Sequence, residues 1–164
     1  MKSKIPAGAK PSGKKKRSVS GELIDKVFEG FDPSAKDIIL PVLRRTQEVF
    51  GYLDADAVFE VAARLKVSPA QLYGVATFYD QFLTTPAGRN IIRVCTNIAC
   101  NINGAEALLE HLRAKLKVKN GGTTKDGRFT LFEVECIGSC GKGPAITIND
   151  DFHYNLTASK VDEI

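Results

Sequence analysis

Apolar residues follow two different spacings along the chain. Between about residues 20 and 83 they recur every three or four positions, which is the spacing of one face of an α-helix. This pattern predicts four helices, whose apolar positions run through 23–31, 38–50, 57–65 and 69–82. We therefore expect an N-terminal helical bundle.

Turn and capping residues set the expected ends of these helices. Pro33 follows the first helix and Gly51 the second, because neither residue suits a helix interior. The run 68–71 begins the fourth, with Ser68 as N-cap of a capping box. The fourth helix is expected to bury Leu72, Val75, Ala76, Tyr79 and Phe82. The segment 84–88, rich in threonine, proline and glycine, ends it.

From Asn90 onward the spacing changes to that of a mixed α/β fold. Short apolar runs predict strands at 91–94, 129–135, 145–148 and 152–156. A leucine-rich helix is expected at 105–116, and a C-terminal helix should begin at Thr157 as its N-cap. The order β-α-β-β-α resembles a thioredoxin-like sheet. We therefore predict an α/β domain over residues 90–164.

The chain has 164 residues and a net charge of +4, and this charge is unevenly distributed. Seven of its 23 Lys and Arg residues precede the first acidic residue, Glu22, so 16 basic residues face 19 acidic ones thereafter. Residues 1–18 have few large apolar side chains to offset the entropy of ordering. We expect a disordered basic tail that is a solvated arm and binds no nucleic acid, since no aromatic residue accompanies its run 14–17.

Several functions are disfavoured by what the sequence lacks. No window is apolar enough for a membrane span. There is no glycine-rich dinucleotide motif, no phosphate-binding loop and no readable nucleophile motif. We therefore expect no catalytic site on this chain.

Four cysteines, Cys95, Cys100, Cys136 and Cys140, are the candidate site residues. They form two pairs, spaced C-x4-C and C-x3-C, and each pair follows a predicted strand. Because open α/β sheets place their sites at the carboxyl ends of strands, we expect the pairs to meet there.

Three kinds of site use four cysteines. Disulfides are disfavoured, because the chain shows no secretory signal and is long enough for a core. A zinc site usually has C-x2-C spacing, which also marks dithiol oxidoreductases, and both gaps here are wider. A [2Fe-2S] cluster needs two thiolates on each of two irons, so it is favoured, and zinc stays the alternative.

The residues around the cysteines support an anionic cluster. Gly138, Gly141 and Gly143 would let the backbone approach it closely, although turn geometry also explains a glycine. The predicted helix 105–116 would begin beside the first pair, with its positive end toward the site.

The chain resembles a known family, the thioredoxin-like [2Fe-2S] subunit of respiratory complex I (24 kDa or E type). The same subunit recurs in NAD-linked hydrogenases and formate dehydrogenases. The motifs that carry the resemblance are Gly51-Tyr-Leu53, Tyr73-Gly-Val-Ala-Thr-Phe-Tyr79, Val94-Cys-Thr, Glu133-Val-Glu-Cys-Ile-Gly-Ser-Cys140 and Ile148-Asn-Asp150. Two positions depart from the family pattern, and neither is expected to touch a ligand. They are Gly143 in the loop Gly-Lys-Gly-Pro144, where the family commonly has Ala before Pro, and His153, where a small residue is more usual.

The resemblance implies a function and partners. It implies that all four cysteines ligate one [2Fe-2S] cluster. It also implies that residues 19–85 are an interaction segment that docks a flavin/NADH-binding iron–sulfur subunit of the complex I 51 kDa type, which carries FMN. The expected function is one-electron transfer in an NADH-linked oxidoreductase, a hydrogenase or a formate dehydrogenase, in a prokaryotic cytoplasm or peripheral to a membrane complex. The alternative is a zinc-stabilised interaction module without a redox role.

Overall fold

The structure is a computed structural model that describes residues 19–35 and 37–164. The chain divides between Pro86 and Ala87 into two compact units. We call residues 19–86 the helical unit and residues 87–164 the sheet unit. The tail predicted to be disordered, residues 1–18, lies outside the described residues.

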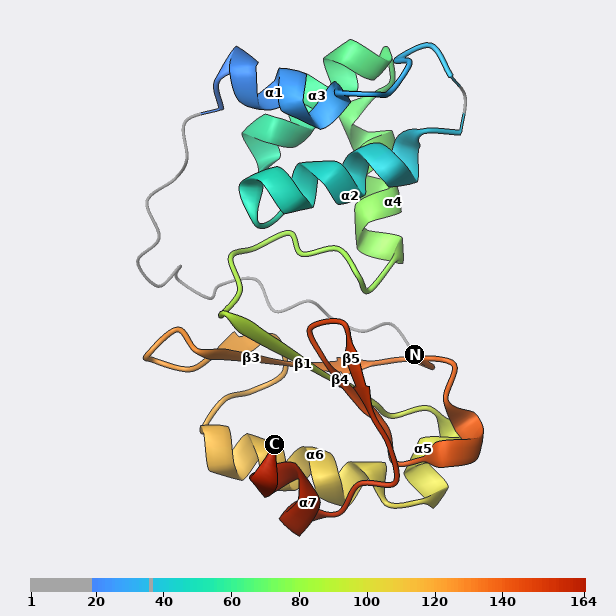
Figure 1. Ribbon diagram of the computed structural model, residues 1–164, viewed down its shortest axis with the longest axis vertical. Coiled ribbons are helices and arrows are strands. Elements are labelled where there is room, and N and C mark those ends of the chain that lie inside the picture. Colours follow the sequence, from blue (N-terminus) through green and yellow to red (C-terminus); the bar gives the residue numbers. More distant parts are fainter. Residues whose placement is uncertain (1–18, 36) are drawn as a thin grey trace. The chain divides into compact units, whose positions relative to one another are not determined.

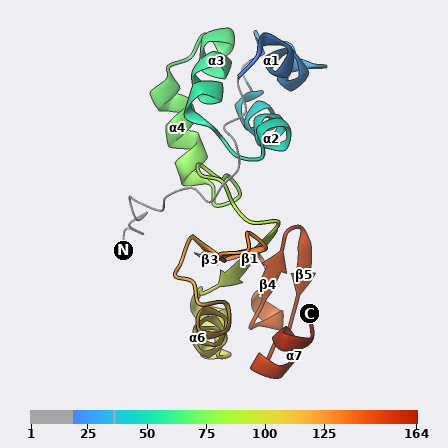
Figure 2. The same cartoon turned by 90° about the vertical axis from the view of Figure 1, so that its left-hand side faces the viewer.

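Four helices that share one apolar core make up the helical unit (Figure 2). They are α1 (Gly21–Phe28), α2 (Ile39–Phe50), α3 (Ala55–Leu65) and α4 (Pro69–Phe78). Each contributes side chains that are fully or almost fully buried, among them Val27, Leu43, Val61 and Leu72. Burial of these side chains from four helices, at about 1.5–3 kcal/mol each, gives the unit a core of its own.

Capping residues act at the helix ends where the sequence predicts them. Gly51 ends α2 with a φ of 85°, and its N–H donates to the Gln47 carbonyl at 2.7 Å. This left-handed conformation suits glycine because it has no Cβ. Ser68 begins α4, and its hydroxyl accepts from the Gln71 N–H at 3.2 Å.

The end of α4 differs from the prediction. The helix stops at Phe78, and Tyr79, expected to be buried, adopts an extended conformation and is 39% exposed. The chain then turns, with the Phe82 N–H donating to the Tyr79 carbonyl at 3.0 Å, and this turn returns Phe82 to the core. The prediction was wrong here because α4 is apolar around much of its circumference, so spacing alone does not identify its inner face.

The sheet unit has five strands in the order β2-β3-β1-β4-β5. They are β1 (Asn90–Cys95), β2 (Gly122–Thr123), β3 (Phe129–Val134), β4 (Ile146–Ile148) and β5 (Asp151–His153). β1 runs parallel to β3, and the other pairs are antiparallel. The helices α6 (Ala105–Leu116) and α7 (Ala158–Glu163) lie on one side of the sheet (Figure 1).

The structure refines the predicted elements of the sheet unit. Helix α6 has the predicted bounds, and the Thr157 hydroxyl caps α7 by accepting from the Lys160 N–H at 3.3 Å. The strand predicted at 152–156 is shorter, because Asn155 takes a positive φ of 50° that ends an extended run. Helix α5 (Ile98–Ile102) and strand β2 were not predicted, since each is too short to show a period.

Gly88 fixes the start of the sheet unit against β3. Its N–H donates to the Thr130 hydroxyl at 2.6 Å. A Cβ at this position would lie 2.9 Å from the Phe129 carbonyl carbon, a distance that no side chain tolerates. The next amide, that of Arg89, donates to the Gly127 carbonyl at 3.1 Å. The chain therefore enters β1 in a defined position.

None of the described helices combines the length and apolar character needed to cross a lipid bilayer.

Candidate metal centre

Two cysteine loops meet at one edge of the sheet. Cys95 is the last residue of β1, and Cys136 follows β3 by two residues. Because β1 and β3 are parallel and Cys95 is in register with Val134, both strands deliver their cysteines to the same edge. The predicted position at the carboxyl ends of these strands is therefore confirmed.

The first pair lies in the interior. Cys95 and Cys100 are each 2% exposed. They pack with Ala145 and with Ala105, the first residue of α6. The Cys95 N–H donates to the Ala145 carbonyl at 3.2 Å. As predicted, the amino end of α6 lies beside this pair.

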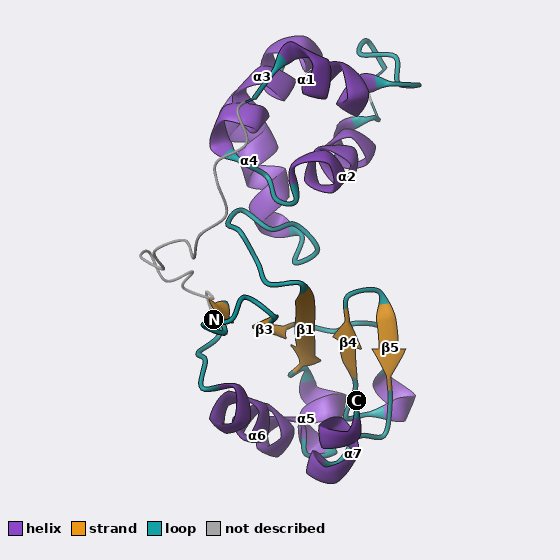
Figure 3. Ribbon diagram, turned by 60° about the vertical axis from the view of Figure 1, so that its left-hand side comes forward, coloured by secondary structure: helices purple, strands orange, loops and turns teal. Residues whose placement is uncertain are grey.

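The second pair lies at the surface. Cys136 and Cys140 are both exposed, and Cys140 begins the single turn of 3-10 helix η1 (Cys140–Lys142). Figures 1 and 3 show α5 close to the turn that contains η1, at the same end of the sheet. The loops that carry the two pairs therefore lie side by side.

The sulfur atoms of the second pair lie slightly closer together than two ligands of one metal ion. The Cys136 and Cys140 Sγ atoms are 3.4 Å apart. Two thiolates bound to one tetrahedral ion at about 2.3 Å lie about 3.8 Å from each other, so a small adjustment suffices. Gly138, at a φ of 80°, directs its N–H to the Cys136 Sγ at 3.4 Å.

The environments of the thiols change their acidity in opposite directions. Burial, followed by hydrogen bonding with Cys95, raises the pKa of Cys100. The Gly138 N–H, followed by hydrogen bonding with Cys140, lowers the pKa of Cys136. Hydrogen bonding with Cys136 raises the pKa of Cys140. Cys95 interacts with both Cys100 and Cys136, so the four thiols form one continuous group.

The three glycines near the site have different roles. A Cβ on Gly143 would lie 3.2 Å from both the Cα and the Sγ of Cys100. The expectation that this position touches no ligand is therefore wrong, because the backbone of Gly143 closely approaches the candidate ligand Cys100. Gly138 supplies an N–H donor in a left-handed conformation. Gly141 has no atom of the chain within 4 Å of its Cβ position, so it packs against neither cysteine loop. The close approach of its backbone to a cluster stays a prediction.

The donor set fits a two-iron cluster. Four thiols from two loops provide two ligands for each iron, and thiolates are the usual ligands of such clusters. Among the described residues, no three His, Cys, Asp or Glu side chains converge tightly enough to hold a single ion.

Some features of the site were not evident from the sequence. Ile98 and Ile102 of α5 are 76% and 81% exposed and form an apolar rim beside the cysteines. The packing role of Ala145 was also missed, because the residue was interpreted only as the start of a strand. His111 of α6 pairs through Nε2 with Asp162 at 2.8 Å and takes no part in the site.

Comparisons with known proteins agree with this geometry. The family model of the thioredoxin-like [2Fe-2S] ferredoxins matches residues 24–164. An E-type subunit of NADH-quinone oxidoreductase from Rhizobium meliloti (strain 1021) is 41% identical over 132 residues, which are 80% of this chain and 79% of that protein. The E-type subunit of NADH-quinone oxidoreductase from Escherichia coli (strain K12) is 39% identical over 133 residues, 81% of this chain and 79% of that protein.

A solved structure is similar as well. A crystal structure of NAD+-reducing [NiFe]-hydrogenase in the air-oxidized state matches 77% of this chain with a TM-score of 0.66 and 28% identity. This chain spans only 22% of that hydrogenase chain. Since the family model covers most of the sequence, the chain belongs to the thioredoxin-like [2Fe-2S] ferredoxin family.

Proposed function

We propose that Cys95, Cys100, Cys136 and Cys140 hold one [2Fe-2S] cluster and that the chain is an electron-transfer subunit of an NADH-linked oxidoreductase. One observation carries this proposal: the parallel strands β1 and β3 bring the two cysteine loops to one edge of the sheet. A cluster bound there would supply a one-electron redox couple.

The two cysteine pairs would hold such a cluster in different environments. Buried Cys95 and Cys100 exclude water from one side of the site. On the other side, exposed Cys136 and Cys140 face the solvent, where a redox partner can approach. The Gly138 N–H stabilises negative charge on the Cys136 sulfur.

The partner is a flavin-bearing subunit of the complex I 51 kDa type, which binds NADH and carries FMN. A hydride carries two electrons and a [2Fe-2S] cluster accepts one, so a flavin has to stand between them. This chain has no dinucleotide motif of its own. The names of its relatives, NADH-quinone oxidoreductase and NAD+-reducing hydrogenase, support a nicotinamide-linked complex.

The helical unit is the natural dock for that partner. Tyr73 and Phe78 of α4 are 55% and 77% exposed, which is unusual for large aromatic side chains and typical of the core of an interface. We place the complex in a prokaryotic cytoplasm, peripheral to a membrane where its acceptor is a quinone. In other complexes, a hydrogenase or formate dehydrogenase subunit would replace the subunits that reduce the quinone.

Metal and sulfide analysis tests the cofactor. Protein prepared anaerobically should contain two irons and two acid-labile sulfides per chain, and dithionite should produce one S = 1/2 signal in electron paramagnetic resonance. Stoichiometric zinc without sulfide, in protein expressed with ample iron, would instead establish the zinc-stabilised module.

A reconstitution experiment tests the role. The purified chain alone should not oxidise NADH with an artificial acceptor, and the mixture with the co-purifying flavoprotein should. NADH oxidation by the flavin-free chain would overturn the role as an electron carrier.

A further inference from the structure

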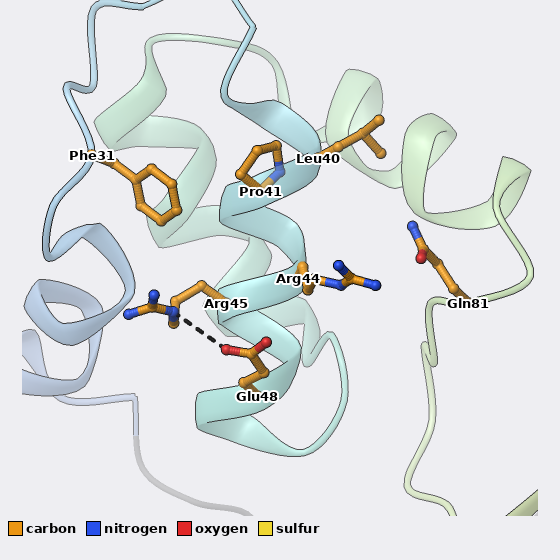
Figure 4. Close-up of a pocket in the computed structure, with 7 residues that line it drawn as sticks. All are labelled: Phe31, Leu40, Pro41, Arg44, Arg45, Glu48 and Gln81. Carbon is orange, nitrogen blue, oxygen red and sulfur yellow. Dashed lines mark ion pairs between the residues drawn. The ribbon is translucent and has the colours of Figure 1, made fainter. Parts of the chain in front are cut away.

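A pocket of about 350 Å³ lies on the helical unit, between α2 and the turn that follows α4. The residues that line it are Phe31, Leu40, Pro41, Arg44, Arg45, Glu48 and Gln81. Figure 4 shows the two arginines on different sides of α2, with Arg44 extended toward Gln81. The pocket thus has one cationic wall and one amide wall.

The two arginines differ in what they contact. Arg45 is engaged, because its Nε lies 3.3 Å from a Glu48 carboxylate oxygen and its guanidinium lies 5.8 Å from the Phe31 ring centroid. Arg44 is exposed and makes no hydrogen bond or ion pair with any residue that the structure describes. Among the described residues that line the pocket, Glu48 is the one acid, and Arg45 already holds it. Arg44 therefore has donors to offer to an outside group.

The amide wall is held in place by α2 itself. The Gln47 side chain donates through Nε2 to the Gln81 carbonyl at 3.1 Å and accepts through Oε1 from the Leu83 N–H at 2.6 Å. These two hydrogen bonds fix the turn that carries Gln81 relative to α2. A pocket whose walls are already positioned loses less entropy when a partner binds.

Charge and apolar surface identify the occupant. The helical unit has ten acidic and six basic residues. Arg44, which has no ion pair with the part of the chain that the structure describes, is therefore a local cation on an acidic body. Exposed Phe78 and Tyr79, with ring centroids 4.9 Å apart, directly precede the turn of Gln81. A complementary segment would present a carboxylate beside apolar side chains.

We propose that this pocket anchors a single carboxylate within a partly apolar segment of the flavin-bearing partner subunit. Arg44 holds the carboxylate with the paired N–H donors of its guanidinium, and the Gln81 amide donates from the opposite wall. Phe78 and Tyr79 cover the apolar neighbours of that carboxylate. The inference rests on the proposed function, which supplies the partner.

Binding measurements on the full chain with its cluster test the anchor, with the co-purifying flavoprotein as the probe. Arg44→Ala should raise the dissociation constant about tenfold and Arg44→Glu about a hundredfold, because a repelled carboxylate costs more than a missing contact. Lys66→Glu is the matched control. It makes the same change of charge on an exposed residue outside the pocket, and it should leave binding within about twofold.

A crosslinking experiment locates the contact. In the Arg44→Lys variant, a carbodiimide should join the new amine to a partner carboxylate, and peptide mapping should find apolar neighbours around that residue. Equal affinity of the unsubstituted and Arg44→Glu chains would overturn the anchor while leaving the proposed function intact. If no flavoprotein binds any variant or the unsubstituted chain, the proposed function fails and the anchor fails with it.

Discussion

The two cysteine loops build the two halves of one site by different means. The first loop holds Cys95 and Cys100 by burial, against the start of α6 and Ala145. The second holds Cys136 and Cys140 at the surface, with a glycine N–H directed at one sulfur. We infer that the buried first loop would control whether a cluster is retained. The exposed second loop would control the reduction potential of that cluster, since exposure and hydrogen bonds to sulfur set this potential.

The largest effect should come from filling the space between the loops. Gly143→Val would place carbon atoms against the Cα and Sγ of buried Cys100, where even a Cβ lies at 3.2 Å. We expect iron content below a tenth of the normal value and a loss of about 1–3 kcal/mol in the free energy of unfolding of the apo chain. Iron analysis and urea denaturation measure these two quantities.

Gly141→Val is the matched control, because no atom lies within 4 Å of a Cβ at that position. It should retain its iron. If both variants bound iron normally, the close contact between the loops would be irrelevant to the site.

The next effect concerns the ligands themselves. Cys100→Ser should lose most of its cluster, because the buried hydroxyl is a harder ligand and costs about 1–3 kcal/mol where it lacks a partner. Cys140→Ser should keep a cluster with a shifted visible spectrum, because water solvates the exposed hydroxyl. Absorption spectra and sulfide content of both variants give the comparison. Equal cluster loss would mean that burial does not distinguish the loops.

A moderate effect is expected in the reactivity of the apo chain. The thiolate is the nucleophile, and the Gly138 N–H lowers the pKa of Cys136, whereas burial raises the pKa of Cys100. As pH rises, Cys136 should therefore become reactive at a pH below that of an ordinary thiol. Cys100 should become reactive only at a pH above it. Mass spectrometry after brief iodoacetamide treatment at several pH values would rank them. If Cys100 were alkylated before Cys136, the expected difference in reactivity between the buried and the exposed pair would be contradicted.

The smallest effect tests backbone conformation in the second loop. Gly138→Ala forces a Cβ into the left-handed region at a φ of 80° and should cost about 1–2 kcal/mol in the free energy of unfolding. Gly141→Ala should change this free energy by less than about 0.5 kcal/mol, since that position is open and outside the left-handed region. Urea denaturation of the two apo variants suffices. Equal costs would show that the loop relaxes around Gly138.

Local signals made much of the fold predictable. The spacing of Leu108, Leu109 and Leu112 predicts the bounds of α6, and the Ser68 cap predicts the start of α4, because these features depend on neighbouring residues. The position of the cysteines at the strand ends was predictable for the same reason.

What the sequence could not predict depends on distant packing. Tyr79 is exposed because the chain turns after α4. This turn could not be predicted from the apolar spacing, because α4 is apolar on several sides. Likewise, Gly141 and Gly143 look alike in sequence, and only the Cys100 contact from the other loop restricts the space at one of them, Gly143. The burial of Cys95 and Cys100 depends in part on Ala145, which lies far from that pair in sequence.

The contacts of Gly88 define the first residue that an isolated sheet unit would need. The predicted start at residue 90 would omit the Gly88 bond to Thr130 and the Arg89 bond to Gly127. The buried Thr130 hydroxyl would then lose the amide donor that Gly88 provides. A fragment that starts at Ala87 keeps both bonds. A fragment of the sheet unit should therefore include residues 87–89. These residues precede β1 and would be taken for a linker if only the strands were considered.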